Sequence, residues 1–333
     1  MKRLLDRLVS YGSAAAILAS LMPLAARHDW AFDLATHFRL QYIAVDALLV
    51  LACALQRKPV RCLALVCCAA LSTWPVLPYV GVVPTAVAGA PPSGPPIALL
   101  SANVLFKNHS ATRLLEIVHD ASPDVVLLVE YTPEWADMVG ELRAAYPHHF
   151  EQPRSDPYGI ALFSRYELDD VASFALGDTT AVEASVRTPR GPLAFIGVHL
   201  RAPTTPSLQA MRNRQLDELA ARVARVNGPL AVMGDFNITP YSPYFQDWLA
   251  RTGLTDTRRG RTPSPSWPTT LPILLIPIDH CAVSHEVTIV AHRGLPAFGS
   301  DHYPILAKLA LPPPAVPISA ATSTNKNLGA VRE

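Results

Sequence analysis

Three long apolar segments near the start of the chain limit what it can fold into more than any other feature of the sequence. They cover residues 8–26, 38–55 and 62–83, and each approaches the roughly 20 residues that a helix needs to cross the apolar core of a bilayer. Asp46 lies inside the second segment, where an acid is costly unless it faces a polar partner. We therefore predict an α-helical transmembrane region over residues 1–83, with about three helices.

Basic residues predict how these segments are oriented in the membrane. Six of them lie before the first segment or in the loop between the second and the third: Lys2, Arg3, Arg7, Arg57, Lys58 and Arg61. Because basic loops stay on the cytoplasmic side, the N-terminus and this loop are expected in the cytoplasm. Three spans then leave the rest of the chain outside. The lipid bilayer is the expected partner of this region, and no protein partner is inferred.

Two alternatives to three spans stay open. Residues 1–26 have the basic start, the apolar core and the small-residue end, "LAA", of a secretory signal peptide. Its removal would leave two spans, with the C-terminal part still outside. The apolar segments could also form a hydrophobic helical bundle in a soluble protein, because such helices can reach the same length.

Proline-rich sequence flanks the remaining part of the chain. Residues 84–96, "PTAVAGAPPSGPP", are expected to be a linker, because this density of proline prevents helix and favours extended backbone. Residues 312–333 have a similar composition and are expected to be a disordered tail. Only Cys281 of the five cysteines lies beyond residue 68, which excludes a disulfide framework in the C-terminal part. The net charge of +1 gives no overall basic field for nucleic acid.

Residues 97–311 alternate between apolar runs typical of buried strands and stretches with helical spacing. Strands are predicted at 97–105, 124–130, 158–165, 193–200, 229–235, 276–284 and 303–311. Helices are predicted at 110–122, 134–145, 206–226 and 243–252. A hairpin is expected around "PRGP" at 189–192. Strands mixed with a hairpin and helices predict an α/β domain with mixed sheets.

Polar residues of types that are common in catalysis follow one predicted strand after another. They are Asn103, Glu130, His199, Asp235, Asn237, Asp279, Asp301 and His302. In an extended chain, Asp235 and Asn237 point to the same face, and Gly234 lets another backbone come close. If the strand ends share one edge of the sheets, these side chains form a single polar cleft.

The chemistry of this set favours hydrolysis at phosphorus. Carboxylates and amides clustered without cysteine prefer a hard cation, so Mg²⁺ or Mn²⁺ is the expected cofactor. Such a cation neutralises charge on a phosphate, and histidine moves protons near neutral pH. Acyl transfer by a serine fits less well, because the chain has no G-x-S-x-G motif. Zinc also fits less well, because no H-E-x-x-H motif occurs.

An ordered set of short motifs resembles the endonuclease/exonuclease/phosphatase superfamily, which includes pancreatic deoxyribonuclease, apurinic endonucleases, neutral sphingomyelinases and inositol-phosphate phosphatases. The motifs are "NVL" (103–105), "PDVVLLVE" (123–130), "GIALFSR" (159–165), "VHL" (198–200), "GDFN" (234–237), "IDH" (278–280) and "SDHYP" (300–304). The resemblance implies a four-layer α/β sandwich of two mixed sheets over 97–311 and a divalent-metal-dependent phosphoric ester hydrolase. With its apolar start, the chain looks like a bacterial membrane-anchored member, which implies an inner-membrane protein with a periplasmic or extracellular catalytic domain.

The resemblance also implies which residues hold the metal. Glu130 is the main ligand, Asn103 assists at the metal or the phosphate, and Asp301 is a metal or second-site ligand. Some nucleases of the superfamily have an acid two residues after the first asparagine. This chain has Leu105 there, which puts a second metal site in doubt.

Five further residues receive catalytic roles from the resemblance. Asp235 orients or deprotonates the attacking water, and Asn237 holds the phosphate. His302 contacts a phosphate oxygen, with Asp279 as its partner. His199 stands where the family has an acid/base histidine or a tyrosine.

The substrate class stays undecided between nucleic acid and a phospholipid or its head group. Arg201, just past His199, is the expected substrate-binding cation because of its place beside the cleft. A membrane tether would raise the effective concentration of an enzyme at a lipid surface, which is the argument for an activity of the sphingomyelinase type. A non-catalytic binding protein on the same fold is a further alternative, because a fold does not fix a function.

Overall fold

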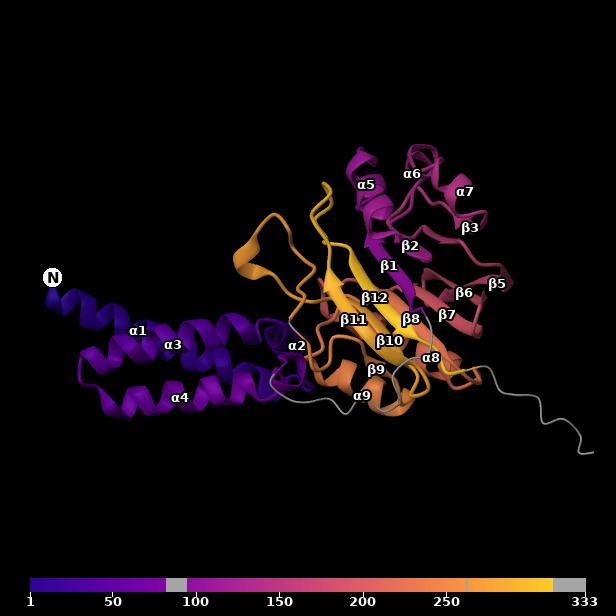
Figure 1. Cartoon of the computed structure of the whole chain (residues 1–333). Coiled ribbons are helices and arrows are strands. Elements are labelled where there is room, and N and C mark those ends of the chain that lie inside the picture. Colours follow the sequence, from indigo (N-terminus) through magenta and orange to yellow (C-terminus); the bar gives the residue numbers. More distant parts are fainter. Residues whose placement is uncertain (82–94, 262, 314–333) are drawn as a thin grey trace, which may run out of the picture.

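Two six-stranded sheets form the centre of the computed structural model, which describes residues 1–81, 95–261 and 263–313 (Figure 1). The first sheet has the order β11 (Thr288–Gly294), β12 (Ile305–Ala310), β1 (Ile97–Asn103), β2 (Val125–Val129), β4 (Ile160–Ser164), β3 (His148–Gln152). The second has the order β5 (Leu168–Leu176), β6 (Thr179–Thr188), β7 (Gly191–His199), β8 (Leu230–Asp235), β10 (Asp279–Val283), β9 (Thr255–Asp256). In each sheet one neighbouring pair is parallel, β1 with β2 and β7 with β8, and the other pairs are antiparallel.

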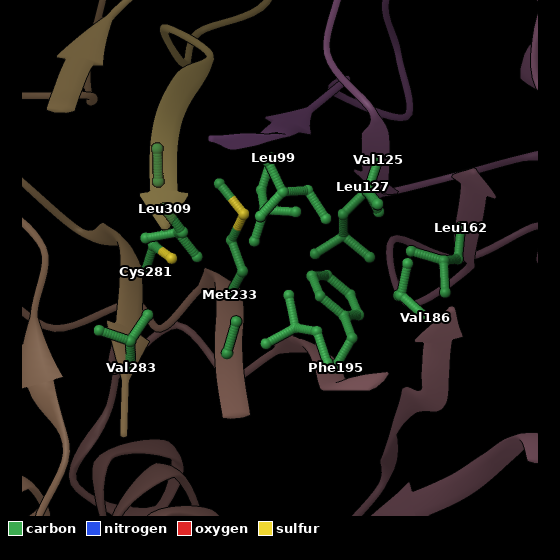
Figure 2. Packing of buried hydrophobic residues seen from close by; sticks show 14 of the residues in the cluster. Leu99, Val125, Leu127, Leu162, Val186, Phe195, Met233, Cys281, Val283 and Leu309 are labelled. Atoms are coloured by element: carbon green, nitrogen blue, oxygen red, sulfur yellow. The ribbon is translucent and has the colours of Figure 1, made fainter. Parts of the chain in front are cut away.

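The sheets pack face to face through every second residue of their central strands. Leu99 and Leu127 from the first sheet meet Phe195 and Met233 from the second in one buried apolar cluster (Figure 2). Because side chains alternate along a strand, the residues between these positions point to the outer faces. This alternation decides later which polar residues reach the space between the sheets.

Helices cover both outer faces of the pair of sheets. The first sheet is covered by α5 (Thr112–Ala121), α6 (Pro133–Met138) and α7 (Leu142–Ala145), which share a buried cluster with β1, β2 and β4. The second is covered by α8 (Pro206–Val223) and α9 (Pro243–Thr252), which pack on β7 and β8. Helix, sheet, sheet and helix make four layers, so the predicted α/β sandwich of two mixed sheets is confirmed.

The N-terminal residues form a helical bundle beside the sandwich (Figure 1). Its helices are α1 (Lys2–Leu21), continued by the short helix η1 (Met22–Ala25), α3 (Arg39–Leu55) and α4 (Pro59–Thr73). The N-terminus and the turn between α3 and α4 lie at the end far from the sheets. The short helices α2 (Trp30–Thr36) and η2 (Leu77–Tyr79) lie where the bundle meets the sandwich.

The helices of the bundle differ in length from the predicted membrane spans. Of the described residues, only Lys2–Ala25 forms a straight helix that is long and apolar enough to cross a membrane. Helices α2 and α3 pass the same test together but are bent by 72°. Helix α4 has 15 residues and ends at Thr73, well before residue 83, because Pro75 follows closely and has no backbone N–H to continue the helical hydrogen bonds.

A buried polar network joins the bundle to the sandwich. Asp33 of α2 accepts hydrogen bonds from Arg212 Nη2 at 2.7 Å and from Ser242 Oγ at 2.7 Å, and both Asp33 and Arg212 are fully buried. His37 Nδ1 lies 2.9 Å from Thr239 Oγ1. The helical region therefore contacts α8 and the segment after β8 directly. The predicted linker 84–96 and tail 312–333 lie almost wholly outside the described residues.

Candidate active site

Four of the predicted site residues end the inward-facing rows of central strands. Asn103 continues the row of Leu99 on β1, and Asp235 continues that of Met233 on β8. His199 on β7 and Asp279 on β10 do the same, and both pair with Asp235 in the register of the second sheet. All four are at most 5% exposed. The sandwich thus turns them into one space at the edge between its sheets.

Asp235 is the centre of this group. Its Oδ2 accepts a hydrogen bond from Asn103 Nδ2 at 3.1 Å. The same oxygen lies 3.6 Å from His199 Nε2 and 3.7 Å from His302 Nε2. Residues from three other segments therefore converge on a single carboxylate oxygen of Asp235, as a shared site requires.

His302 and Asp279 form a buried ion pair beside Asp235. His302 Nδ1 lies 2.8 Å from Asp279 Oδ2. Burial alone lowers the pKa of His302, but the carboxylates of Asp279 and Asp235 outweigh it and raise this pKa to about 10. Burial alone raises the pKa of Asp279, but the charge and hydrogen bond of His302 hold it below its usual range. A cationic imidazole thus faces the space above Asp235.

The pKa of Asp235 is shifted in the opposite direction to that of Asp279. Burial raises the pKa of its carboxyl, and the nearby Asp279 carboxylate raises it further, to about 6. A carboxylate with this pKa is ionised at neutral pH and is a better proton acceptor than an ordinary aspartate.

Glu130 reaches the same group from the end of β2. Its Oε1 accepts from Asn103 Nδ2 at 2.9 Å, and its Oε2 accepts from the backbone N–H of Phe106 at 3.0 Å. Glu130 has φ of 61° and Leu105 has φ of 58°, a left-handed backbone that is costly for both residue types. Such strain occurs where surrounding structure holds a functional side chain in place.

The segment after Asp235 departs from the extended geometry assumed above. Strand β8 ends at Asp235, and Asn237 has φ of 50°. Asn237 Nδ2 donates to the Leu200 carbonyl at 2.9 Å, so its amide is tied to the end of β7 instead of standing parallel to Asp235. Gly234 does permit close approach of a backbone, because a Cβ there would lie 1.9 Å from the Val198 carbonyl oxygen.

Two other predicted residues lie near the group but are engaged elsewhere. Asp301 Oδ2 accepts from Trp267 Nε1 at 3.0 Å, while its Oδ1 has no hydrogen-bond partner among the described residues. Arg201 pairs with Asp178, and its Nη1 donates to the Tyr158 hydroxyl at 2.6 Å. The charge of Arg201 is therefore already balanced.

Sequence reasoning missed three residues that support the site. Ser266 Oγ accepts the backbone N–H of Asp279 at 3.1 Å, and Ser300 Oγ donates to the Asn103 carbonyl at 2.7 Å. The ring of Tyr158 lies 5.3 Å from that of His199. The place of Ser300 just before "DH" was an available signal, because serine often caps such turns. Ser266 and Tyr158 gave none.

His280, adjacent to Asp279, does not belong to the site. It points to the outer face of β10, where its Nε2 lies 2.7 Å from the Ile238 carbonyl oxygen and its Nδ1 lies 2.9 Å from Asp256 Oδ2. Alternation along the strand separates the two neighbours.

The donor set fits a hard divalent cation. Carboxylates of Glu130 and Asp235 both approach the Asn103 amide, and the free Oδ1 of Asp301 adds another oxygen. Ligand atoms of Asp235, Asp279 and His302 also lie within 4.8 Å of one another. We favour the Glu130 side, because the pKa of His302 keeps its imidazole protonated and a protonated imidazole does not ligate metal.

Comparison with protein families gives a match to the whole of this region. The model of the Endonuclease/Exonuclease/phosphatase family matches residues 100–302, which is more than half of the chain. A search of curated proteins gives no match.

Several solved structures share the fold. An endonuclease/exonuclease/phosphatase from Beutenbergia cavernae is 20% identical, with a TM-score of 0.53 over 66% of this chain and 72% of that one. TDP2 from D. rerio, complexed with a single-strand DNA product, is 18% identical, with a TM-score of 0.54 over 64% of this chain and 98% of that one. TDP2 from C. elegans is 16% identical, with a TM-score of 0.55 over 67% and 78%.

Proposed function

Because the chain belongs to the endonuclease/exonuclease/phosphatase family, we propose that it is a divalent-metal-dependent hydrolase of phosphate esters. The observation that carries the proposal is the convergence of Asn103, His199 and His302 on one oxygen of Asp235. A buried acid with a pKa near neutrality, flanked by a cationic histidine, is a combination suited to attack on phosphorus.

Asp235 is the proposed base for the attacking water. It takes a proton as the water oxygen forms its bond to phosphorus, and the ester P–O bond breaks. His302, held cationic by Asp279, faces the phosphate and stabilises the charge that develops on its oxygens. Asn237 is the proposed holder of the phosphate, through the Nδ2 hydrogen that the Leu200 carbonyl does not accept.

His199 is the proposed acid for the leaving group. Its Nδ1 lies 3.1 Å from the Pro157 carbonyl oxygen, which fixes that nitrogen as the donor and turns Nε2 toward Asp235. In the doubly protonated ring Nε2 also carries a proton, and this proton passes to the departing alkoxide. The ester oxygen then leaves as a hydroxyl, and the ring keeps its Nδ1 proton.

Glu130, Asn103 and Asp301 are the proposed ligands of Mg²⁺ or Mn²⁺. When bound, the cation neutralises charge on the phosphate and lowers the barrier to departure of the ester oxygen. Glu130 has both carboxylate oxygens held by N–H donors, so its position does not depend on the metal.

Membrane anchoring with the sandwich outside the cytoplasm is part of the proposal. The apolar helix Lys2–Ala25 supports anchoring. The N-terminus and the α3–α4 turn, where the basic residues cluster, lie far from the sheets (Figure 1), which supports an outward-facing catalytic domain. A periplasmic face of a bacterial inner membrane is the location that fits this orientation.

Two substrate classes follow from the same chemistry. The DNA product held by D. rerio TDP2 favours nucleic acid, whereas the bundle favours a lipid phosphate ester. A binding protein without activity is a weaker candidate, because every strand end keeps its polar residue.

Hydrolysis of two chromogenic esters by the full chain in detergent micelles tests the proposal. We expect turnover of p-nitrophenyl phosphate, of its bis ester, or of both, with Mg²⁺ or Mn²⁺. EDTA should lower the rate on the order of 100-fold or more, since the cation neutralises the phosphate. Asp235→Asn should lower kcat by roughly 10²–10⁴, the usual effect of losing a general base.

Asp120→Asn is the matched control. Asp120 lies on α5 with its side chain 77% exposed, and its loss should leave the rate as in the wild type. Turnover that is insensitive to both EDTA and Asp235→Asn would contradict the proposed function.

A further inference from the structure

An apolar loop projects from the catalytic sandwich toward the bundle. Outside the N-terminal helices, the large apolar side chains that are exposed in the described residues are Leu271, Ile273, Leu274 and Val290. Three of these four belong to residues 271–275, here called the apolar loop, and Ile273 is 75% exposed. An exposed apolar cluster of this kind marks a surface that another apolar phase covers.

Hydrogen bonds fix the apolar loop to the end of the bundle that lies nearest the sheets. Gln41, in the first turn of α3, donates from Nε2 to the carbonyls of Ile273 at 3.3 Å and Leu275 at 3.0 Å. In Figure 1 the loop leans over the ends of the helices that face the sheets. The helices of the bundle also carry exposed leucines and valines, so both the loop and the helices present apolar side chains to their surroundings. A bilayer around the helices therefore meets the loop.

A groove between α1 and α3 begins at this loop. It has a volume of about 480 Å³, within the range of ligand sites, and Leu274 forms part of its lining. Its α1 wall consists of the small residues Gly12, Ala15, Ala16, Ala19 and Ser20. Asp46 also lines it, is fully buried, and has an Oδ1 with no hydrogen-bond partner in the described part of the chain. A hydroxyl or amide N–H of an occupant would satisfy that oxygen.

The groove and the candidate active site lie within the reach of one amphiphile. Asp279 lies five positions after Leu274, which limits the distance between their Cα atoms to about 18 Å. One leaflet has an apolar depth of about 15 Å. The other end of the segment is also tied to the site, because Ser266 binds the Asp279 backbone and Trp267 binds Asp301.

We propose that the ester hydrolysed is a phosphate ester of a membrane lipid, with its apolar chain in the groove between α1 and α3 and its phosphate at Asp235 and His302. The apolar loop enters the bilayer surface beside it. This inference rests on the proposed function. Arg201 already pairs with Asp178, so its charge is not free to bind the backbone of a nucleic acid, and a lipid phosphate ester does not require that charge.

Two chromogenic diesters that differ only in chain length test the inference in the full chain. We expect kcat/KM for p-nitrophenyl decyl phosphate to exceed that for p-nitrophenyl methyl phosphate by on the order of 100-fold or more. Each buried methylene contributes about fourfold, so burial of only three or four of the extra methylenes gives this ratio. Ala15→Trp, which fills the groove, should reduce this ratio at least about tenfold by removing the space for those methylenes. Ala14→Trp is the matched control, because Ala14 is exposed on the same helix outside the groove and should keep the ratio.

A second pair of variants tests the loop independently. Ile273→Asp should lower turnover of the decyl ester in phosphatidylglycerol vesicles at least about tenfold relative to the methyl ester, because a charge resists entry into the bilayer. Val290 is also exposed and apolar but lies outside the loop, so Val290→Asp should not lower the turnover of the decyl ester relative to the methyl ester.

Two results would overturn the inference and leave the proposed function standing. One is an equal kcat/KM for the decyl and methyl esters. The other is a decyl-to-methyl ratio in the groove and loop variants that equals the ratio in their controls. Preference for p-nitrophenyl thymidine phosphate over the decyl ester would assign nucleic acid instead. Failure to hydrolyse these three diesters, p-nitrophenyl phosphate and its bis ester would overturn the proposed function as well.

Discussion

Asp235 shows how alternation along a strand selects the residues of the site. It follows Met233 on the inward face of β8, just as Asn103 follows Leu99 on β1 and Asp279 precedes Cys281 on β10. The sequence allowed this prediction because the apolar runs are clear and their ends are polar. It did not allow a prediction of the exact aim of Asn237, because a left-handed backbone after the strand depends on the neighbouring Leu200 carbonyl.

The acidity of Asp235 leads to a prediction about pH. Its pKa of about 6 comes from burial and from the Asp279 carboxylate, and a base must be ionised to act. We therefore expect kcat/KM for a chromogenic ester to increase as the pH rises through about 6, and to decrease as the pH falls below that value. A pH–rate profile with Mg²⁺ held saturating measures this, and a flat profile between pH 4.5 and 8 would count against Asp235 as the base.

At the scale of elements, the strong strands and helices were predictable and the edges were not. Predicted strands at 97–105, 124–130 and 229–235 match β1, β2 and β8 within two residues at each end, because their buried residues form long apolar runs. Strands β3, β5, β9 and β11 were missed. All four lie at sheet edges, where a strand as short as β9, or a half-exposed polar sequence such as "HHFEQ", carries little apolar pattern.

Helix α2 supplies a contact that no local pattern could indicate. Asp33 and Arg212 are separated by 179 residues, and Arg212 Nη1 also donates to the Asn237 carbonyl at 3.3 Å. The ion pair thus links the bundle to the segment that follows Asp235. Its existence depends on tertiary packing, which is why the sequence suggested only a tether at this position.

Replacing Asp33 tests this contact. Asp33→Ala leaves the buried guanidinium of Arg212 without its partner and should cost about 3–5 kcal/mol of unfolding free energy. That corresponds to a fall in Tm of roughly 10 °C for a domain of this size. Asp29→Ala, which removes only the N-cap of α2, should cost about 1 kcal/mol. Thermal unfolding of the full chain in detergent followed by tryptophan fluorescence compares the two, and equal Tm values would show that the helices are a passive tether.

At the scale of the whole molecule, one edge of the sandwich carries both the candidate active site and the contact with the bundle. The family match covers residues 100–302 and leaves the bundle outside it. Yet α2 touches the segment after β8, and Gln41 of α3 binds the apolar loop, which follows Ser266, a partner of Asp279. The helices are therefore fixed in position relative to the site. Motif order predicted the sandwich, whereas this arrangement required coordinates, because its contacts join distant parts of the chain.

The most direct test of the central claim is a double-variant comparison of Glu130 and Asp235, the two acids that share the Asn103 amide. Catalytic groups of one site act as a unit, so each of Glu130→Gln and Asp235→Asn should lower kcat/KM by roughly 10²–10⁴, and the double variant should lie within about threefold of the worse single variant. If the double variant instead loses the product of the two single effects, the two acids act independently, and these strand ends do not form one active site.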